Sequence, residues 1–162
     1  MFVLVDFDPD GIAILSTYKY GSYRLAHEDV TLLNTPALSL PNIRWLGIKS
    51  HDLSQSATVK DVTETNATPQ PQGLMRLTVR DRRKAARMLE WNLCVENGPE
   101  QSWRQELQRM LMLNTKAEMQ VMDELIPGGL VSWLSNKLEH TTEQLVTSAP
   151  IGSTSSDDGM LF

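Results

Sequence analysis

The sequence is short of cysteine: Cys94 is the only one among 162 residues. A single thiol makes neither an internal disulfide nor a cysteine-based zinc site, and its use fits a reducing compartment. Apolar runs long enough to cross a membrane are also missing, which predicts no transmembrane helix. The first ten residues, MFVLVDFDPD, lack a basic start and a small-residue cleavage site, so they do not resemble a signal peptide.

An excess of positive charge is missing as well. The formal net charge is −5, which argues against a simple basic coat protein for nucleic acid. DNA chemistry stays open, because carboxylates that hold a metal ion are acidic and a local basic patch can still contact phosphates. With 41% hydrophobic and 22% charged residues, the chain is suited to one globular domain with a proper core.

The spacing of the apolar residues predicts an α/β fold. Residues 2–5 (FVLV) and 43–48 (IRWLGI) are short apolar runs typical of buried strands. A helix over 12–20 is expected to follow the first strand after a tight turn, and Gly21 is expected to end it. Further helices are predicted at 77–91, 102–114, 115–126 and 130–138, with the Met and Leu stripes of the middle two in the core.

Composition divides the chain into four parts. Residues 1–53 hold the first strand–turn–helix unit and the second strand. Residues 54–73, rich in Ser, Thr, Gln and Pro, are expected to be a flexible insertion. Residues 74–139 carry the remaining helices, and residues 140–162, which lack periodicity, are expected to form a disordered tail.

Three alternating aspartates, Asp6, Asp8 and Asp10, stand where the first strand ends. This is where α/β folds place ligands. A calcium loop of the EF-hand type is excluded, because its twelfth position needs a bidentate glutamate and holds Thr17 here. The loop also needs a preceding helix, and the residues before Asp6 resemble a strand.

Two chemical interpretations and one purely structural interpretation remain for the three aspartates. An aspartyl phosphatase is a remote alternative: Asp6 and Asp8 match its nucleophile and its acid/base, but the adjacent acidic pair near the C-terminus, at 157–158, lies in the predicted tail. A magnesium site is the second, because two carboxylates can share one hard cation with phosphate oxygens. Solvated aspartates that cap a helix explain the tripeptide alone equally well.

Basic residues crowd the predicted helix 77–91, and Asp81 is the one aspartate among them. Thr78 and Asp81 form an acceptable capping pair at its start. The basic side chains are either a solvated helix face or an edge that contacts phosphates, and the sequence leaves both interpretations open.

Five motifs in order resemble one known family, the Toprim domain in the A subunit of topoisomerase VI and its meiotic relatives, which make the double-strand breaks that initiate recombination. The motifs are VDFDPDGIAILSTYKYGS (5–22), LPNIRWLGIKSHDL (40–53), LTVRDRRKAARML (77–89), WRQELQRMLMLNTKAEMQ (103–120) and LSNKL (134–138). The resemblance implies a partial Toprim domain, with a Rossmann-like, mostly parallel sheet, flanking helices and a helical C-terminal extension.

The resemblance also implies roles for particular residues. Asp6 and Asp8 fall on the carboxylates that bind Mg²⁺ in this family, whereas Asp10 falls on a position that is not a ligand. The candidates for DNA contacts are Lys19, Arg44, Arg80 and Lys84.

Family members are type IIB topoisomerase A subunits or their relatives, in which a tyrosine hydroxyl attacks a phosphodiester. That tyrosine and a Toprim glutamate have no match here: Tyr18, Tyr20 and Tyr23 do not fall on the nucleophile. We therefore expect a fragment, or a decayed copy, without catalytic residues of its own and without cleavage activity.

The partners implied by the resemblance are DNA, a second copy in a homodimer, other meiotic break-forming proteins and a topoisomerase VI B-like subunit, with no membrane. The implied location is the nucleus, on chromosomes. A non-catalytic dimerisation or interaction module is the alternative function.

Overall fold

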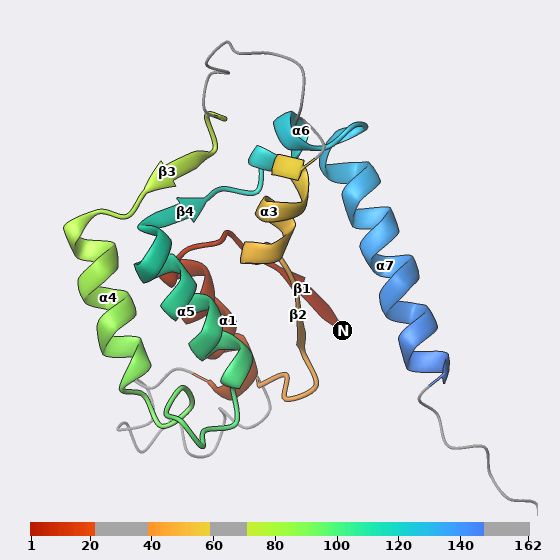
Figure 1. The fold of residues 1–162 in the computed structure, drawn as a ribbon. Helices are drawn as coiled ribbons and strands as arrows, with labels where there is room; N and C mark the ends of the chain where they lie inside the picture. Colours follow the sequence, from red (N-terminus) through yellow and green to blue (C-terminus); the bar gives the residue numbers. More distant parts are fainter. Residues whose placement is uncertain (22–38, 59–70, 148–162) are drawn as a thin grey trace, which may run out of the picture.

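Strands and helices alternate along the computed structural model, which describes residues 1–21, 39–58 and 71–147 (Figure 1). The strands are β1 (Phe2–Leu4), β2 (Arg44–Gly47), β3 (Leu74–Arg76) and β4 (Thr115–Ala117). The helices are α1 (Pro9–Tyr20), α3 (Ser50–Thr58), α4 (Val79–Leu89), α5 (Gln101–Leu113), α6 (Val121–Leu125) and α7 (Gly129–Thr147). The α/β fold class is confirmed. None of the described helices is long and apolar enough to cross a membrane.

Two strand pairs are joined through the acidic motif. β1 and β2 are parallel, with Phe2 opposite Arg44, and β3 and β4 are antiparallel, with Leu74 opposite Ala117. An isolated antiparallel bridge between Phe7 and Ala117 links the two pairs. The sheet therefore matches the expected parallel pairing at β1 and β2, while its other half is antiparallel.

The core lies between the strands and three helices. α1, α4 and α5 gather on one side of β1 and β2, and α7 lies on the other (Figure 1). The residues at most 2% exposed include Phe7, Ile12, Leu15, Ile48, Met88, Trp103, Leu107 and Met110. The predicted Met and Leu stripe of α5 is therefore core at Leu107 and Met110, although Met112 and Leu113 are exposed.

Helix α1 begins three residues earlier than the predicted start because the turn residues belong to it. Asp8 is its N-cap, and Pro9 follows in the first turn, where the fixed φ of proline suits a helix. Gly21 ends α1 with φ 86°, a conformation that favours glycine, and its N–H donates to the Thr17 carbonyl. The prediction of Gly21 as the stop is confirmed.

The single helix predicted over 115–126 is wrong. Residues 115–117 form β4, and only Val121–Leu125 is helical. Asn114 adopts the left-handed conformation with φ 51° and ends α5. The backbone beyond it then pairs with β3 and with Phe7, and these tertiary hydrogen bonds override the helical pattern.

Two segments predicted to be irregular are partly helical. α3 continues to Thr58, so residues 54–58 of the predicted insertion are ordered in a helix. α7 continues to Thr147, so residues 140–147 of the predicted tail extend the helix expected at 130–138. Neither stretch contains a glycine or proline that would stop the helix. The rest of the predicted insertion up to residue 70, and residues 148–162, lie outside the described residues.

Candidate metal and DNA site at the end of β1

The acidic motif is held in place from both sides. Val5 continues the pairing with β2, donating its N–H to the Gly47 carbonyl at 2.9 Å. Phe7 is fully buried and exchanges two backbone hydrogen bonds with Ala117, at 2.8 and 3.0 Å. Because side chains alternate along an extended chain, burial of Phe7 puts Asp6 and Asp8 together on the opposite face.

One oxygen of each carboxylate is anchored by a backbone amide. The Met119 N–H donates to Asp6 Oδ1 at 2.8 Å, and the Gly11 N–H donates to Asp8 Oδ1 at 2.6 Å. Within the described residues, no hydrogen bond reaches the second oxygen of either group. Both carboxylates therefore combine a fixed position with one oxygen that can face a cation.

Gly11 allows α1 to start this close to the strand. A Cβ at this position would lie 2.5 Å from the Asp6 carbonyl oxygen and 3.2 Å from Asp8 Oδ1. Both distances are shorter than ordinary van der Waals contact, so a side chain here would push the helix away from the carboxylates. The glycine of the motif is thus required by the geometry of the site.

Negative charge is crowded at this strand end. Burial raises the pKa of Asp8, and the nearby charges of Asp10 and Asp6 raise it further, against the opposing Gly11 N–H and Lys116. A group in this condition is stabilised by any cation that approaches it.

Two lysines, Lys84 and Lys116, partly balance the negative charge of the acidic motif. Lys84 of α4 forms an ion pair with Asp10. Lys116 Nζ of β4 lies 2.9 Å from Asp81 Oδ2. The pKa of Lys116 is raised mainly by its hydrogen bond to Asp81, and also by the charges of Asp8 and Asp10. Asp81 itself completes the predicted capping box with Thr78 at the start of α4, which is confirmed. α4 is thereby fastened beside the acidic motif.

The donor set fits Mg²⁺ better than a fully protein-enclosed metal. Among the described residues, no three or more His, Cys, Asp or Glu side chains are assembled for a metal ion. Mg²⁺ in phosphate-handling sites commonly uses one or two carboxylates and completes its octahedron with water and phosphate oxygens. Asp6 and Asp8 offer that number of ligands.

Lys19, a predicted DNA contact, lies at the other end of α1, about 16 Å along the helix from Asp8. Its ammonium forms an ion pair with Glu100, which is only 6% exposed and also accepts a hydrogen bond from the Tyr20 hydroxyl at 2.5 Å. The same ammonium lies 5.7 Å from the Trp103 ring centre. Lys19 is thus engaged within the protein.

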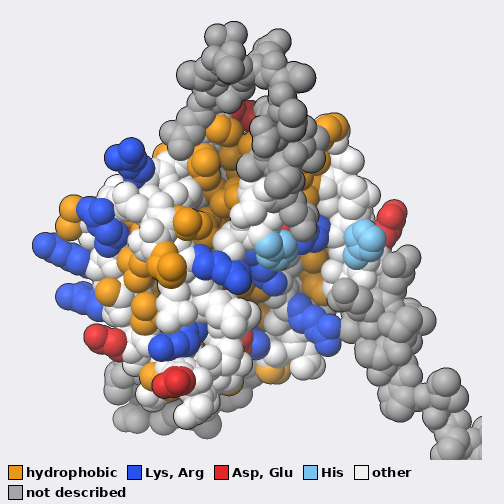
Figure 2. Space-filling model, in the orientation of Figure 1, with side chains coloured by type: hydrophobic (Ala, Val, Ile, Leu, Met, Phe, Trp, Pro, Cys, Tyr) orange, Lys and Arg blue, Asp and Glu red, His pale blue; other side chains and the backbone are white. Residues whose placement is uncertain are grey.

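The other predicted DNA contacts fall in two places. Arg80 and Lys84 lie on α4 and line a shallow hollow with Val79, Arg83 and Arg87. Figure 2 shows more Lys and Arg than Asp and Glu on the face it presents. Arg44 is exposed on β2, opposite the first residue of β1 rather than its acidic end. The structure therefore brings Lys84 to the acidic motif, with Arg80 one turn away on the same helix, and leaves Lys19 and Arg44 elsewhere.

Sequence reasoning missed Lys116 and the amide of Met119. Both belong to the KAEMQ motif at 116–120, which the apolar spacing places in a helix. The available signal was the motif itself, which begins two residues after Asn114, the residue that ends α5.

A strand, a tight turn and a helix that present two carboxylates at the strand end are the arrangement of a Toprim domain. The family model for the Toprim domain of Spo11 and the topoisomerase 6 A subunit matches residues 1–138. The chain belongs to this family, which confirms the resemblance of the five motifs.

Individual relatives agree with the family. The chain is 34% identical over 142 residues to human "Meiotic recombination protein SPO11". The matched region covers 86% of this chain and 30% of the relative. It is 34% identical over 122 residues to "Meiotic recombination protein SPO11-1" of Oryza sativa subsp. indica, covering 75% and 27%. It is 30% identical over 122 residues to the A subunit of DNA topoisomerase 6 from Arabidopsis thaliana, covering 75% and 24%. The chain thus spans less than a third of the length of these relatives.

Proposed function

We propose that this chain is the Toprim part of a type IIB topoisomerase-like protein that cleaves DNA to form meiotic double-strand breaks. The observation that carries the proposal is the pair Asp6 and Asp8, two anchored carboxylates on one face, each with an oxygen left for a cation. In a member of this family, such a pair is best explained as a Mg²⁺ site. Residues 1–53 and 74–139 are the proposed parts of the Toprim unit.

The proposed roles follow from the geometry. Asp6 and Asp8 hold Mg²⁺, and the amides of Met119 and Gly11 keep both carboxylates oriented. The bound metal would neutralise phosphate charge at the scissile bond and position the strand for in-line attack. Arg80 and Lys84 on α4 are the best placed of the proposed DNA contacts.

Lys19 and Arg44 are weaker candidates for DNA binding. Lys19 must leave Glu100 before it contacts a phosphate, and breaking a buried pair is costly. Arg44 is exposed and accessible, but lies beside the beginning of β1.

The whole relatives supply the remaining parts of the proposal. Because this chain corresponds to less than a third of their length, the tyrosine nucleophile and the Toprim glutamate are proposed to lie outside the 162 residues, and this chain alone is proposed not to cleave DNA. The proposed setting is a homodimer on DNA, with other break-forming proteins and a topoisomerase VI B-like subunit, on chromosomes in the nucleus. Relatives named as meiotic recombination proteins support this setting.

A non-catalytic interaction module is the second candidate. Met112 and Leu113 are consecutive apolar residues at the end of α5, and they are 83% and 62% exposed. Burial of these two side chains against another chain would remove apolar surface from water. A module of this kind associates with itself or with a relative. It binds Mg²⁺ no more tightly than a variant that lacks the carboxylates of Asp6 and Asp8.

Calorimetric titration of Mg²⁺ into the 162-residue protein tests the proposal. Asp6→Asn and Asp8→Asn are each expected to weaken Mg²⁺ binding at least about tenfold, since each removes a charged ligand. Asp10→Asn is the matched control, with the same change of charge in the same turn, and is expected to weaken binding less than about threefold. Equal losses in all three variants would show a general charge effect and contradict the two-carboxylate site.

A further inference from the structure

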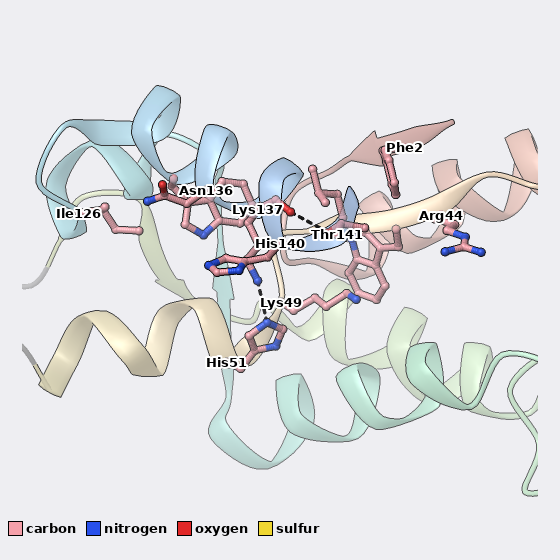
Figure 3. Close-up of a pocket in the computed structure, with 12 residues that line it drawn as sticks. Phe2, Arg44, Lys49, His51, Ile126, Asn136, Lys137, His140 and Thr141 are labelled. Carbon is pink, nitrogen blue, oxygen red and sulfur yellow. Dashed lines mark hydrogen bonds between the residues drawn. The ribbon is translucent and has the colours of Figure 1, made fainter. Parts of the chain in front are cut away.

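A second polar site lies between β2, the start of α3 and α7. It is a pocket of about 680 Å³, and Figure 3 shows the side chains that line it. Its basic side chains are Arg44, Lys49, His51, Lys137 and His140. None of its described lining residues is an Asp or Glu, and none belongs to the acidic motif.

The acid that contacts the cations of this pocket, Asp52, is buried. Asp52 is 2% exposed, and its Oδ1 lies 2.6 Å from Lys137 Nζ and 3.2 Å from His51 Nε2. Its Oδ2 accepts the Lys49 backbone N–H at 2.9 Å. Asp52 therefore works as an internal counter-charge that holds Lys137 and His51 in place, and it leaves positive charge in excess at the surface.

Tryptophans position the lysines. Lys49 Nζ lies 5.4 Å from the ring centre of Trp45, and Lys137 Nζ lies 5.6 Å from that of Trp133. Trp133 also packs closely on the backbone at Gly47, where an added Cβ would lie 2.6 Å from the indole. The aromatic rings thus join α7 to β2, and one ammonium group lies beside each ring.

The cations are crowded in a way that an anion would relieve. Lys49 is half-buried; burial lowers its pKa and the charge of Lys137 lowers it further, against the opposing charges of Asp52 and Glu106. In Figure 3, His51 from α3 is turned toward Lys137 and His140 of α7, while Arg44 extends from β2 at the other end of the pocket and is directed away from these three side chains. Several N–H donors from separate elements around one opening suit a group with several acceptor oxygens.

We propose that this pocket binds a phosphate group, at a site separate from Asp6 and Asp8. Arg44 and Lys49 are the phosphate-binding side chains, and Lys137 with His51 forms the fixed wall behind them. The phosphate belongs either to a nucleic-acid backbone or to a small phosphate-bearing molecule. Because Arg44 is already a candidate DNA contact, a nucleic-acid phosphate at this site would rest on the proposed function and deepen it, whereas a small phosphate-bearing molecule would go beyond it. The site requires neither Mg²⁺ nor the acidic motif, so its test is separate from that of the proposed function.

The test is a titration of the full 162-residue protein followed by the NMR signals of the histidine ring C–H groups. Two of the three histidines, His51 and His140, line the pocket. Inorganic phosphate and a short DNA duplex are added in separate experiments, with a chelator present so that no divalent cation contributes. Sodium chloride at matched ionic strength is the control for general screening.

The variant is Arg44→Gln combined with Lys49→Gln, and Arg76→Gln is the matched control, an exposed arginine on β3 outside the pocket. Phosphate is expected to shift the His51 and His140 signals saturably. The double variant is expected to weaken this binding by about tenfold or more, and the control to leave it unchanged. If the double variant does not fold, Arg44→Gln alone gives the same comparison, since Arg44 is exposed.

The two arms identify the source of the phosphate. Saturation by the duplex at much lower concentration than by inorganic phosphate assigns the pocket to a nucleic-acid backbone. Saturation by inorganic phosphate alone assigns it to a small phosphate-bearing molecule. Shifts that match those of sodium chloride, or that persist in the double variant, overturn the proposal. A failure of Mg²⁺ to bind at Asp6 and Asp8 leaves this result unaffected.

Discussion

The two ends of α1 belong to one sequence motif, but the charged side chains at these ends differ in how far the protein itself balances them. At the N-terminal end, Asp8 keeps an oxygen without a hydrogen bond from the described residues, and burial and like charges raise its pKa. At the C-terminal end, the ammonium of Lys19 is paired with buried Glu100 and flanked by Trp103. One end leaves negative charge unbalanced, while the other satisfies its charge within the protein.

Charged residues occur in this motif for two different reasons, one at each end of α1. At the acidic end the protein's own partners do not balance the carboxylates, and under the proposed function a bound Mg²⁺ would supply the missing charge. The basic end gains stability from the fold, because Glu100 comes from a segment about 80 residues later in the chain. Substitutions at one end are therefore expected to affect Mg²⁺ binding, and those at the other end stability.

The largest effect on stability is expected at Lys19. Lys19→Met leaves the carboxylate of Glu100 buried without its cation, and the free energy of unfolding is expected to fall by about 3 kcal/mol. Urea denaturation followed by circular dichroism measures the change, and Mg²⁺ affinity is expected to stay as in the wild type. Lys84→Met is the matched control, because Lys84 and Asp10 are more exposed, and it is expected to cost less than about 1 kcal/mol. Equal losses for the two lysines would contradict a structural role for Lys19.

The second prediction compares substitutions of Gly11 and Gly21, the glycines at the two ends of α1. Gly11→Ala forces a Cβ against the Asp6 carbonyl and is expected to cost about 2 kcal/mol and to abolish measurable Mg²⁺ binding. Gly21→Ala has open space but retains a φ of 86°, so it is expected to cost about 1 kcal/mol without change in Mg²⁺ affinity. Thermal unfolding and calorimetry measure both. Unchanged Mg²⁺ binding in Gly11→Ala would show that the carboxylates tolerate a displaced helix.

A third prediction concerns Asp8 in the metal-free protein. Its pKa is raised in the folded state, so its contribution to stability is fully present below the unfolded value and is lost as the pH rises through the folded value. Asp8→Asn keeps an effective N-cap and removes the crowded charge, so the variant is expected to be at least as stable as the wild type at neutral pH. The advantage of the variant is expected to shrink as the pH falls. Unfolding free energies measured across acid and neutral pH check the sign, and a destabilised variant at neutral pH would contradict charge crowding.

The smallest effect is expected at Lys84. Lys84→Gln removes a cation that competes with Mg²⁺ at the acidic end, and it is expected to raise Mg²⁺ affinity about two- to threefold. Calorimetry at low ionic strength measures the change, since exposed charges are screened by salt. Arg82→Gln serves as control, because the Arg82 guanidinium donates to Asn114 at 3.2 Å and not to the acidic motif. A decrease in affinity for Lys84→Gln would show that Lys84 supports the metal site.

Several features of the site were predictable because they are local. The helix after β1 was predicted, although its start was placed at residue 12 and not at Pro9, and the capping pair of Thr78 and Asp81 formed as expected. Other helices were less predictable: α3 lies where no helix was predicted, and α7 continues beyond its predicted end through polar sequence that contains no breaker. The segment at 115–126 was predicted wrongly because its strand exists only through hydrogen bonds to β3 and Phe7.

The sequence by itself determined the family, the α/β class and the position of Asp6 and Asp8 at a strand end, because these depend on residues adjacent in the chain. Only the tertiary structure decided that Met119 orients Asp6, that Glu100 engages Lys19, and that β2 and α7 enclose a basic pocket. Each of these contacts joins segments tens of residues apart. No local pattern of charge or hydrophobicity encodes such a pairing, because it depends on how the strands and helices pack against one another.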